Sequence, residues 1–307
     1  MCSSGCCRPD SHPLPTATSS SRSPSWSRWP QLSSSPRTRE NMRDRLPISQ
    51  QGVPVNKSGW VRVYPDRGSG GQAAARDVAA ELRRVIGAQG SARVVFASAP
   101  SQLEMLQALA REPGIDWGLV EAFHMDEYLG LPSDSPAGFG NWLVANFFRA
   151  VPMGEVHLIA PGPQPEEAVG RYTELLTKSP IDVVCLGIGV NGHIAFNDPG
   201  VADFHDPQPV KVVELDDVCR QQQVDDGCFP SMADVPRSAI TVTIPMLLSA
   251  RRLFCVVPGP AKAEAVRSTV VGRLSTECPG TILRTHPGCT LYLDSESAAA
   301  LRDALVV

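Results

Sequence analysis

His193 can exchange protons near neutral pH, and it lies in the stretch "GIGVNGHIAFNDPG" between two polar neighbours. An imidazole in that role needs a partner to set its tautomer and its charge. Asn191 and Asp198 are the local candidates for that partner. The alternative is a hydrogen-bonded histidine in a surface turn. Because the stretch is rich in glycine and follows an apolar run, we expect these three residues to form a catalytic group.

Two adjacent acids, Asp126 and Glu127, follow the apolar run "GLVEAF" in the segment "HMDEYLGLPSDSP". An acid just past a buried strand either caps a helix, pairs on the surface or points into a cleft. By position, either Asp126 or Glu127 is a candidate catalytic base, and capping or surface pairing is the alternative. His124 falls inside the apolar run, so it is predicted to be a core or rim residue.

Two further segments have the composition of phosphate sites. "SAPSQLEML" leads from an apolar run into a helix, whose N-terminus and the hydroxyls of Ser98 and Ser101 suit an anion. Ser101 and Glu104 also match a capping box, and both interpretations can hold together. In "VVPGPAKAEAV", Lys262 opposes the dipole of the following helix unless an anion binds there; the alternative is a surface lysine. The expected substrate-binding residues are Ser98, Ala99, Ser101, Gly189, Gly192 and Lys262.

The elements that must position these residues alternate along the chain. Helices with apolar residues at three- and four-residue spacing are expected at 71–90, 101–112, 140–151, 166–179, 261–273 and 295–305. Continuous apolar runs predict buried strands at 92–98, 117–125, 156–160, 181–189, 210–215, 238–244, 252–259 and 289–294. This alternation predicts an α/β fold, a three-layer, doubly wound, mainly parallel Rossmann-like sheet. Such sheets bind ligands at the carboxyl ends of their strands, where the four segments lie.

The first 50 residues differ in composition from the rest. They are rich in Ser, Pro and Arg, with seven arginines against three acids, so they carry +4 and the remainder carries −8 of the net −4. We expect residues 1–50 to be a disordered tail and residues 51–307 to be a single α/β domain. The acidic domain argues against nucleic acid as a ligand. A translation start at Met42 would make residues 1–41 an artefact, which we offer as a hypothesis.

Membrane insertion and export are not expected from this sequence. It has no run of about 20 apolar residues and no apolar block of a secretory signal, so the cytoplasm is the predicted compartment. Three of the nine cysteines lie in the tail, and Cys185 and Cys255 lie inside apolar runs, which favours free thiols over disulfides. The tail motif "CSSGCC" has no further ligand at a useful spacing, so no metal site is predicted.

Four motifs, "HMDEYLGL", "LGIGVNGHIAFNDPG", "PGPAKAEAV" and "TILRTHP", resemble in order and spacing the glucosamine-6-phosphate deaminase (isomerase) family, over about residues 55–305. The resemblance implies a hydrolase of amino-sugar metabolism, including N-acetylglucosamine catabolism. It would convert glucosamine 6-phosphate and water into fructose 6-phosphate and ammonium without a metal or organic cofactor. The implied partner is a phosphosugar. Members of the family occur as single chains and as assemblies, so a homo-oligomer is compatible with the resemblance.

The resemblance also implies roles for individual residues. His193 would assist opening of the pyranose ring, and Asp126 would move a proton from carbon 2 to carbon 1 through an enediol-type species. The loop at 98–101 and Lys262 would hold the phosphate. The segment 204–237 would correspond to a mobile lid.

This chain departs from the family pattern at several positions. Asn191 stands where many members have Asp, and Asp198 stands where Glu is usual, which retracts the carboxylate by about 1 Å. The loop "ASAPSQ" replaces a Gly-Gly-Ser/Thr-Pro pattern. The lid arginine of the family has no clear counterpart, although Arg220 is near its place.

These departures leave other activities open. A 6-phosphogluconolactonase-like enzyme, or another sugar-phosphate hydrolase or isomerase, would use the same fold. A non-catalytic sugar-phosphate sensor is the alternative from another class of protein. Regulators of that kind usually carry a helix-turn-helix ahead of the sensor domain, and the tail has no such pattern.

Overall fold

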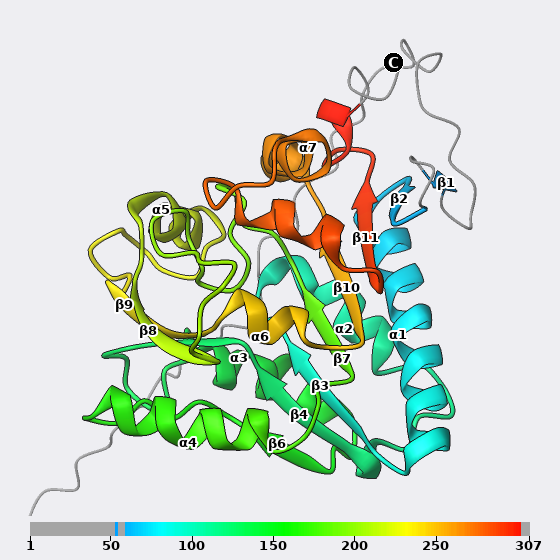
Figure 1. The fold of residues 1–307 in the computed structure, drawn as a ribbon, viewed down its shortest axis with the longest axis horizontal. Coiled ribbons are helices and arrows are strands. Elements are labelled where there is room, and N and C mark those ends of the chain that lie inside the picture. The colour runs from blue at the N-terminus through cyan, green and yellow to red at the C-terminus, as the bar shows by residue number, and fades with distance from the viewer. Residues whose placement is uncertain (1–52, 55–58, 302–307) are drawn as a thin grey trace, which may run out of the picture. The chain divides into compact units, whose positions relative to one another are not determined.

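The computed structural model describes residues 53–54 and 59–301 (Figure 1). The predicted tail, its cysteines and Met42 lie outside these residues. Within the described residues, no helix is both long enough and apolar enough to cross a membrane. Cys185 and Cys255 are buried and free, as predicted.

The main sheet has eight strands in the order β1-β2-β11-β10-β7-β3-β4-β6. The strands are β1 (Val53–Pro54), β2 (Val61–Tyr64), β3 (Ala92–Phe96), β4 (Val120–His124), β6 (Glu155–His157), β7 (Val183–Leu186), β10 (Arg252–Val257) and β11 (Cys289–Asp294). All neighbours from β2 to β6 pair in parallel, and only β1 joins antiparallel. The predicted mainly parallel, doubly wound sheet is therefore confirmed. Its strand order reverses between β3 and β7, and this is where such sheets bind ligands.

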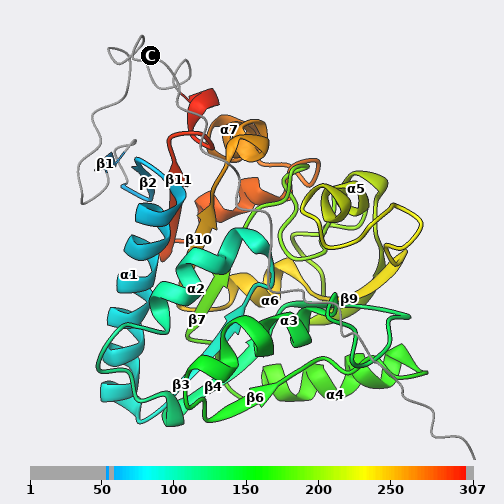
Figure 2. The ribbon, with the colours of Figure 1, turned by 180° about the vertical axis from the view of Figure 1, so that it is seen from behind.

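Helices cover both faces of this sheet (Figures 1 and 2). One face is packed by α1 (Arg67–Gln89), α2 (Leu103–Leu109) and α3 (Phe139–Asn146), and the other by α4 (Pro165–Thr177), α6 (Ile244–Leu248) and α7 (Ala263–Val271). Successive strand residues point to opposite faces, so Val94 joins the first core and Val95 the second. Because both faces are buried, the central strands are mostly apolar, and β7 is apolar at every position.

The boundaries of α1 follow from local chemistry. Asp66 precedes the helix, and its side chain accepts the N–H of Ser69 at 2.7 Å in a capping box. Gly90 ends the helix with a φ of 85°, in the left-handed region that favours glycine.

A second sheet contradicts part of the sequence prediction. The apolar runs at 210–215 and 238–244 do not join the main sheet: β8 (Val210–Glu214) and β9 (Ser238–Val242) pair antiparallel, and β5 (Asp126–Tyr128) completes a three-stranded sheet in the order β5-β9-β8. The edge strand β8 has exposed positions, so it is not covered on both faces. Its apolar composition resembles that of a strand buried on both faces, which is why the prediction was wrong. The helix α5 (Asp217–Asp225), which was not predicted, packs with this sheet around a third core.

Several predicted boundaries were also wrong. The helix expected at 295–305 is, within the described residues, a short 3-10 turn at Ala299–Leu301. The helix expected at 140–151 ends at Asn146, because Phe147 leaves the helical region, and continues as the 3-10 turn Phe148–Ala150. Pro100 starts a 3-10 turn before α2. The strand β2 was not predicted.

Candidate active site

One pocket gathers the chemistry predicted from the four segments. It encloses about 560 Å³, part of it open to solvent, at the carboxyl ends of β3, β4, β7 and β10. The predicted residues that line it are Ser98, Ala99, Ser101, Asp126, Gly189, His193 and Lys262.

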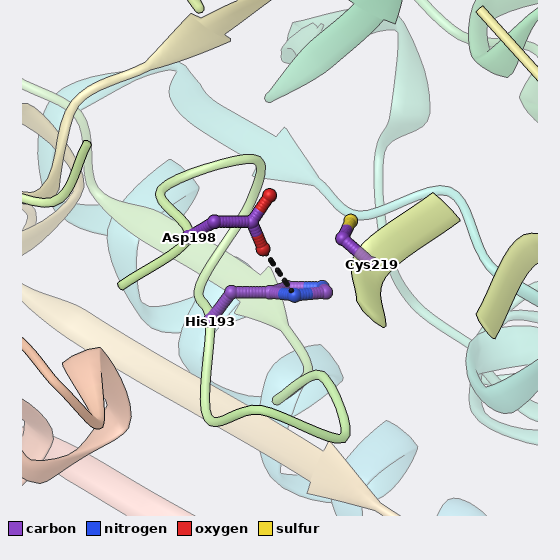
Figure 3. A group of neighbouring side chains, drawn as sticks. All are labelled: His193, Asp198 and Cys219. Carbon is purple, nitrogen blue, oxygen red and sulfur yellow. Dashed lines mark ion pairs between the residues drawn. The ribbon is translucent and has the colours of Figure 1, made fainter. Parts of the chain in front are cut away.

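His193 and Asp198 form a buried pair beside the pocket (Figure 3). Nδ1 of His193 lies 2.9 Å from Oδ1 of Asp198, although the N–H direction is not well aligned with that oxygen. Burial alone would raise the pKa of Asp198. Hydrogen bonding and charge interaction with His193, and the amide of Asn191, outweigh burial and lower this pKa. Asp198 is therefore held as a carboxylate next to the imidazole.

Asn191 ties this pair to α5. Its Nδ2 donates to Asp198 Oδ1 and to Asp216 Oδ2, each at 3.0 Å, and its Oδ1 accepts the main-chain N–H of His193 at 3.1 Å. Asp216 is the N-cap of α5 and also accepts the N–H of Cys219. Sequence reasoning missed Asp216, although an acid just before a helix is an N-cap signal. The amide of Asn191 thus separates two carboxylates and fixes the loop that carries His193.

The rest of the loop is anchored by hydrogen bonds from one side-chain amide and one main-chain N–H. Asn197 donates through Nδ2 to the carbonyls of Ile194 and Val242, and Phe196 donates its N–H to Thr241 Oγ1. These bonds hold the loop on β9 of the small sheet. Ala195 has a φ of 50°, in the region where a side chain is strained.

Gly192 lies behind the pocket and does not line it. It has a φ of 86°, and a side chain at this position would overlap Cys278. Asn191 and Asp198 also lie outside the lining, so they can act on a ligand only through His193.

The two adjacent acids point to different places, because successive residues of β5 face opposite sides. Asp126 lines the pocket and is 5% exposed, and burial together with the charge of Glu127 raises its pKa well above the usual value. Glu127 accepts the N–H groups of Phe139, Gly140 and Tyr128. Asp126 is therefore placed to meet a ligand, and Glu127 anchors the start of α3.

His124 is a core residue, as predicted. It is fully buried, its Nε2 accepts the N–H of Ile159 at 2.7 Å, and burial lowers its pKa to about 3. It stays neutral at physiological pH and does not line the pocket.

Ser98 and Lys262 add polar groups to the lining of the pocket. The Oγ of Ser98 is buried, and it has no hydrogen-bond partner in the described structure. Lys262 is 7% exposed, so the surface-lysine alternative is wrong. Burial lowers the pKa of Lys262 to about 8, with Asp226 opposing that shift. A buried cation and an unpaired hydroxyl that line the same pocket are suited to an anionic group.

The predicted capping box of Ser101 and Glu104 does not form. The turn before α2 has Ala99 at its N-cap position, without a side-chain hydrogen bond, because the chain first makes a 3-10 turn at Pro100. Glu104 pairs instead with Arg67 at 2.6 Å.

Several pocket residues were missed by sequence reasoning. They carry amide or acidic side chains, and they are Gln102, Gln222, Gln223 and Asp226. The last three come from α5 and the residue that follows it, within the segment that the resemblance equated with a lid. No motif marks them, since α5 itself was not predicted.

Arg220, the nearest counterpart of the family's lid arginine, does not line the pocket. Its buried guanidinium donates to the carbonyls of Met232, Val235 and Pro236. Arg220 therefore stabilises the loop after α5.

Comparison with known proteins identifies relatives in sequence. Residues 65–292 match the family model described as glucosamine-6-phosphate isomerases/6-phosphogluconolactonase. A glucosamine-6-phosphate deaminase of an Exiguobacterium species is 35% identical over 198 residues, which is 64% of this chain and 75% of that protein. The deaminase of Halothermothrix orenii is 35% identical over 214 residues, or 67% of this chain and 86% of that protein.

Solved structures agree with this assignment. A monomeric glucosamine-6-phosphate deaminase superposes with a TM-score of 0.72 at 28% identity, covering 78% of this chain and 99% of its own. The 6-phosphogluconolactonase of Trypanosoma brucei, at 19% identity and a TM-score of 0.61, covers 78% of this chain and 98% of its own and shares the fold. This chain belongs to the family of glucosamine-6-phosphate isomerases and 6-phosphogluconolactonases.

Proposed function

We propose that this protein is an enzyme that converts glucosamine 6-phosphate and water into fructose 6-phosphate and ammonium. The observation that carries the proposal is the placing of Asp126 and His193 in one pocket with Lys262. The sequence relatives named above are deaminases for that substrate. In this proposal the net reaction is a hydrolysis of a carbon–nitrogen bond.

His193 opens the sugar ring in this scheme. Because its Nδ1 faces Asp198, the proton is held on that side and Nε2 is free to accept. Nε2 takes the proton of the carbon 1 hydroxyl and returns it to the ring oxygen, which breaks the bond between carbon 1 and the ring oxygen. Asn191 and Asp198 keep the imidazole in this tautomer, so they are positioning residues.

Asp126 then carries out the isomerisation. Its carboxylate takes the proton from carbon 2 of the open aldehyde, and the ammonium group of the substrate gives a proton to the carbon 1 oxygen, which forms the enediol-type species. Asp126 then returns its proton to carbon 1. The product is an iminium at carbon 2, to which water adds before ammonium leaves. The raised pKa of Asp126 makes it a stronger base than an exposed aspartate.

The phosphate binds in the same pocket. Lys262 and the hydroxyls of Ser98 and Ser101 hold it, and the main chain of Ala99 and Gly189 lines the same pocket. This anchor keeps carbons 1 and 2 in register with Asp126.

The test is to incubate the protein with glucosamine 6-phosphate and to measure ammonium and fructose 6-phosphate together. Equal amounts of the two products are expected. Asp126→Asn should abolish turnover while substrate binding, measured by calorimetry, is largely retained. Asp134→Asn, at an exposed loop position, is the matched control and should leave turnover unchanged. Substrate binding without turnover in the wild type would contradict the enzyme proposal and favour a sensor.

The same preparation should also be given 6-phosphogluconolactone. Hydrolysis of the lactone without release of ammonium from the amino sugar would replace the proposed activity with that of a lactonase. The cytoplasm is the compartment we propose for the enzyme, because a phosphosugar is retained there by its charge.

A further inference from the structure

A buried thiol outside the proposed mechanism lies against the catalytic pair (Figure 3). A ring nitrogen of His193, a carboxylate oxygen of Asp198 and Sγ of Cys219 all lie within 4.8 Å of one another. Nδ1 is the ring nitrogen that faces Asp198, at 2.9 Å. The three residues are 8%, 1% and 0% exposed. They come from two separate segments, the loop after β7 and the first turn of α5.

Two carboxylates flank this cluster, and the buried cation Lys262 is close enough to Cys219 for their charges to interact. Asp198 and Asp216 share the amide of Asn191, and in the described structure neither carboxylate forms an ion pair with lysine or arginine. The Cys219 thiol contributes no charge, since burial and these carboxylates raise its pKa. A cation that entered would gain from both carboxylates in a region of low dielectric.

The three donor atoms are an imidazole nitrogen, a carboxylate oxygen and a sulfur. This set selects borderline and soft divalent cations such as Zn²⁺ and Co²⁺, whereas Mg²⁺ and Ca²⁺ prefer oxygen ligands. Three protein ligands leave one tetrahedral position for water.

We propose that His193, Asp198 and Cys219 form an inhibitory binding site for Zn²⁺ and similar cations. On binding, the thiol loses its proton to solvent and the proton of His193 Nδ1 moves to Nε2 or to solvent. When a metal binds Nδ1, the neutral imidazole carries its one proton on Nε2. Nε2 then cannot accept a proton from the substrate, so opening of the sugar ring stops. The binding of Zn²⁺ does not depend on the proposed function, whereas the inhibition of turnover rests on it.

Metal binding is tested first, without any assay of turnover. The full chain is freed of metal and titrated with Co²⁺ and with Zn²⁺ by absorption spectroscopy and calorimetry. The expected Co²⁺ complex shows a thiolate-to-cobalt charge-transfer band that is lost in Cys219→Ala and Cys219→Ser. Both variants should bind Zn²⁺ at least about 10-fold more weakly. Cys228→Ser, which changes a partly exposed thiol nearby, should keep wild-type Zn²⁺ affinity.

Inhibition is tested next with glucosamine 6-phosphate as substrate. Zn²⁺ should inhibit the wild type and Cys228→Ser at the concentration at which it binds. Without metal, both Cys219 variants should retain near wild-type turnover, and with Zn²⁺ they should resist inhibition. Equal Zn²⁺ affinity in wild type and Cys219→Ala, or no charge-transfer band, overturns the site. If no turnover occurs in any sample, the proposed function fails while the titrations still decide the site.

Discussion

The imidazole of His193 occupies the space that a side chain at Gly189 would need. A Cβ added to Gly189 would overlap three atoms of that ring. Gly189 is therefore required for a steric reason as well as for the turn, since the absence of a side chain leaves space for the imidazole.

Gly189→Ala should therefore displace His193 and lower kcat by about 10²- to 10⁴-fold, the usual contribution of a positioned acid or base. The fold should survive, because the imidazole can swing toward the pocket. Gly200→Ala, in the same loop with open space around it, is the control and should have wild-type kcat. Wild-type activity in Gly189→Ala would show that the ring position is not required.

Asp126→Asn should be more stable than the wild type at neutral pH. The pKa of Asp126 is higher in the folded state than its ordinary value of 3.8. Below pH 3.8 the carboxyl group is protonated in both states, and the folded protein has its full stability. As pH rises through the folded-state pKa, this stability is lost. Asparagine cannot ionise, so the variant does not lose this stability at neutral pH. The melting temperature should rise by roughly 2–4 °C for each kcal/mol recovered. The difference should vanish below about pH 4, and an unchanged difference across pH would contradict the buried-charge explanation.

Asn191→Asp should lower stability at neutral pH, by about 2–4 kcal/mol, because it replaces two donated hydrogen bonds with a third carboxylate beside Asp198 and Asp216. The new carboxyl should have a raised pKa in the folded state, so stability should recover as pH falls. Any remaining activity should have its pH optimum shifted upward, since added negative charge favours the protonated imidazole. Asn191→Ala, which removes the bonds without adding charge, separates the two effects in chemical denaturation.

Lys262 should make phosphate binding depend on pH. Its pKa is lowered to about 8 by burial, so the free protein loses this cation as pH rises past that value, and bound phosphate holds the proton. The affinity for fructose 6-phosphate, a probe without an amine, should fall severalfold between about pH 7 and pH 9. Lys262→Arg should abolish this dependence, and Lys262→Met should bind weakly at every pH. Calorimetry at several pH values measures all three.

The loops that follow the buried strands could be predicted from the sequence because the apolar runs and helical spacing are local signals. Ser98, Asp126, His193 and Lys262 come from four such loops, and a parallel sheet brings the ends of its strands to one edge. Local signals did not distinguish Asp126 from Glu127. The family resemblance chose Asp126, and the alternation of side chains along β5, which places Asp126 in the pocket, agrees with that choice.

The small sheet and α5 could not be predicted in the same way. The runs at β8 and β9 have the same apolar composition as the main strands, and no periodicity tells which sheet a strand joins. As a result, the contributions of Gln222, Gln223 and Asp226 to the pocket were missed.

By itself, the sequence determined the class of fold and the types of residue at the strand ends, since each depends on neighbours within a few positions. Only the tertiary structure decided how those residues act together. The bridge from Asn191 to Asp216 and the approach of Cys219 to His193 join segments about 25 positions apart. Such contacts depend on how the small sheet packs against the loop after β7. The spacing of residues within a short stretch of sequence does not indicate this packing.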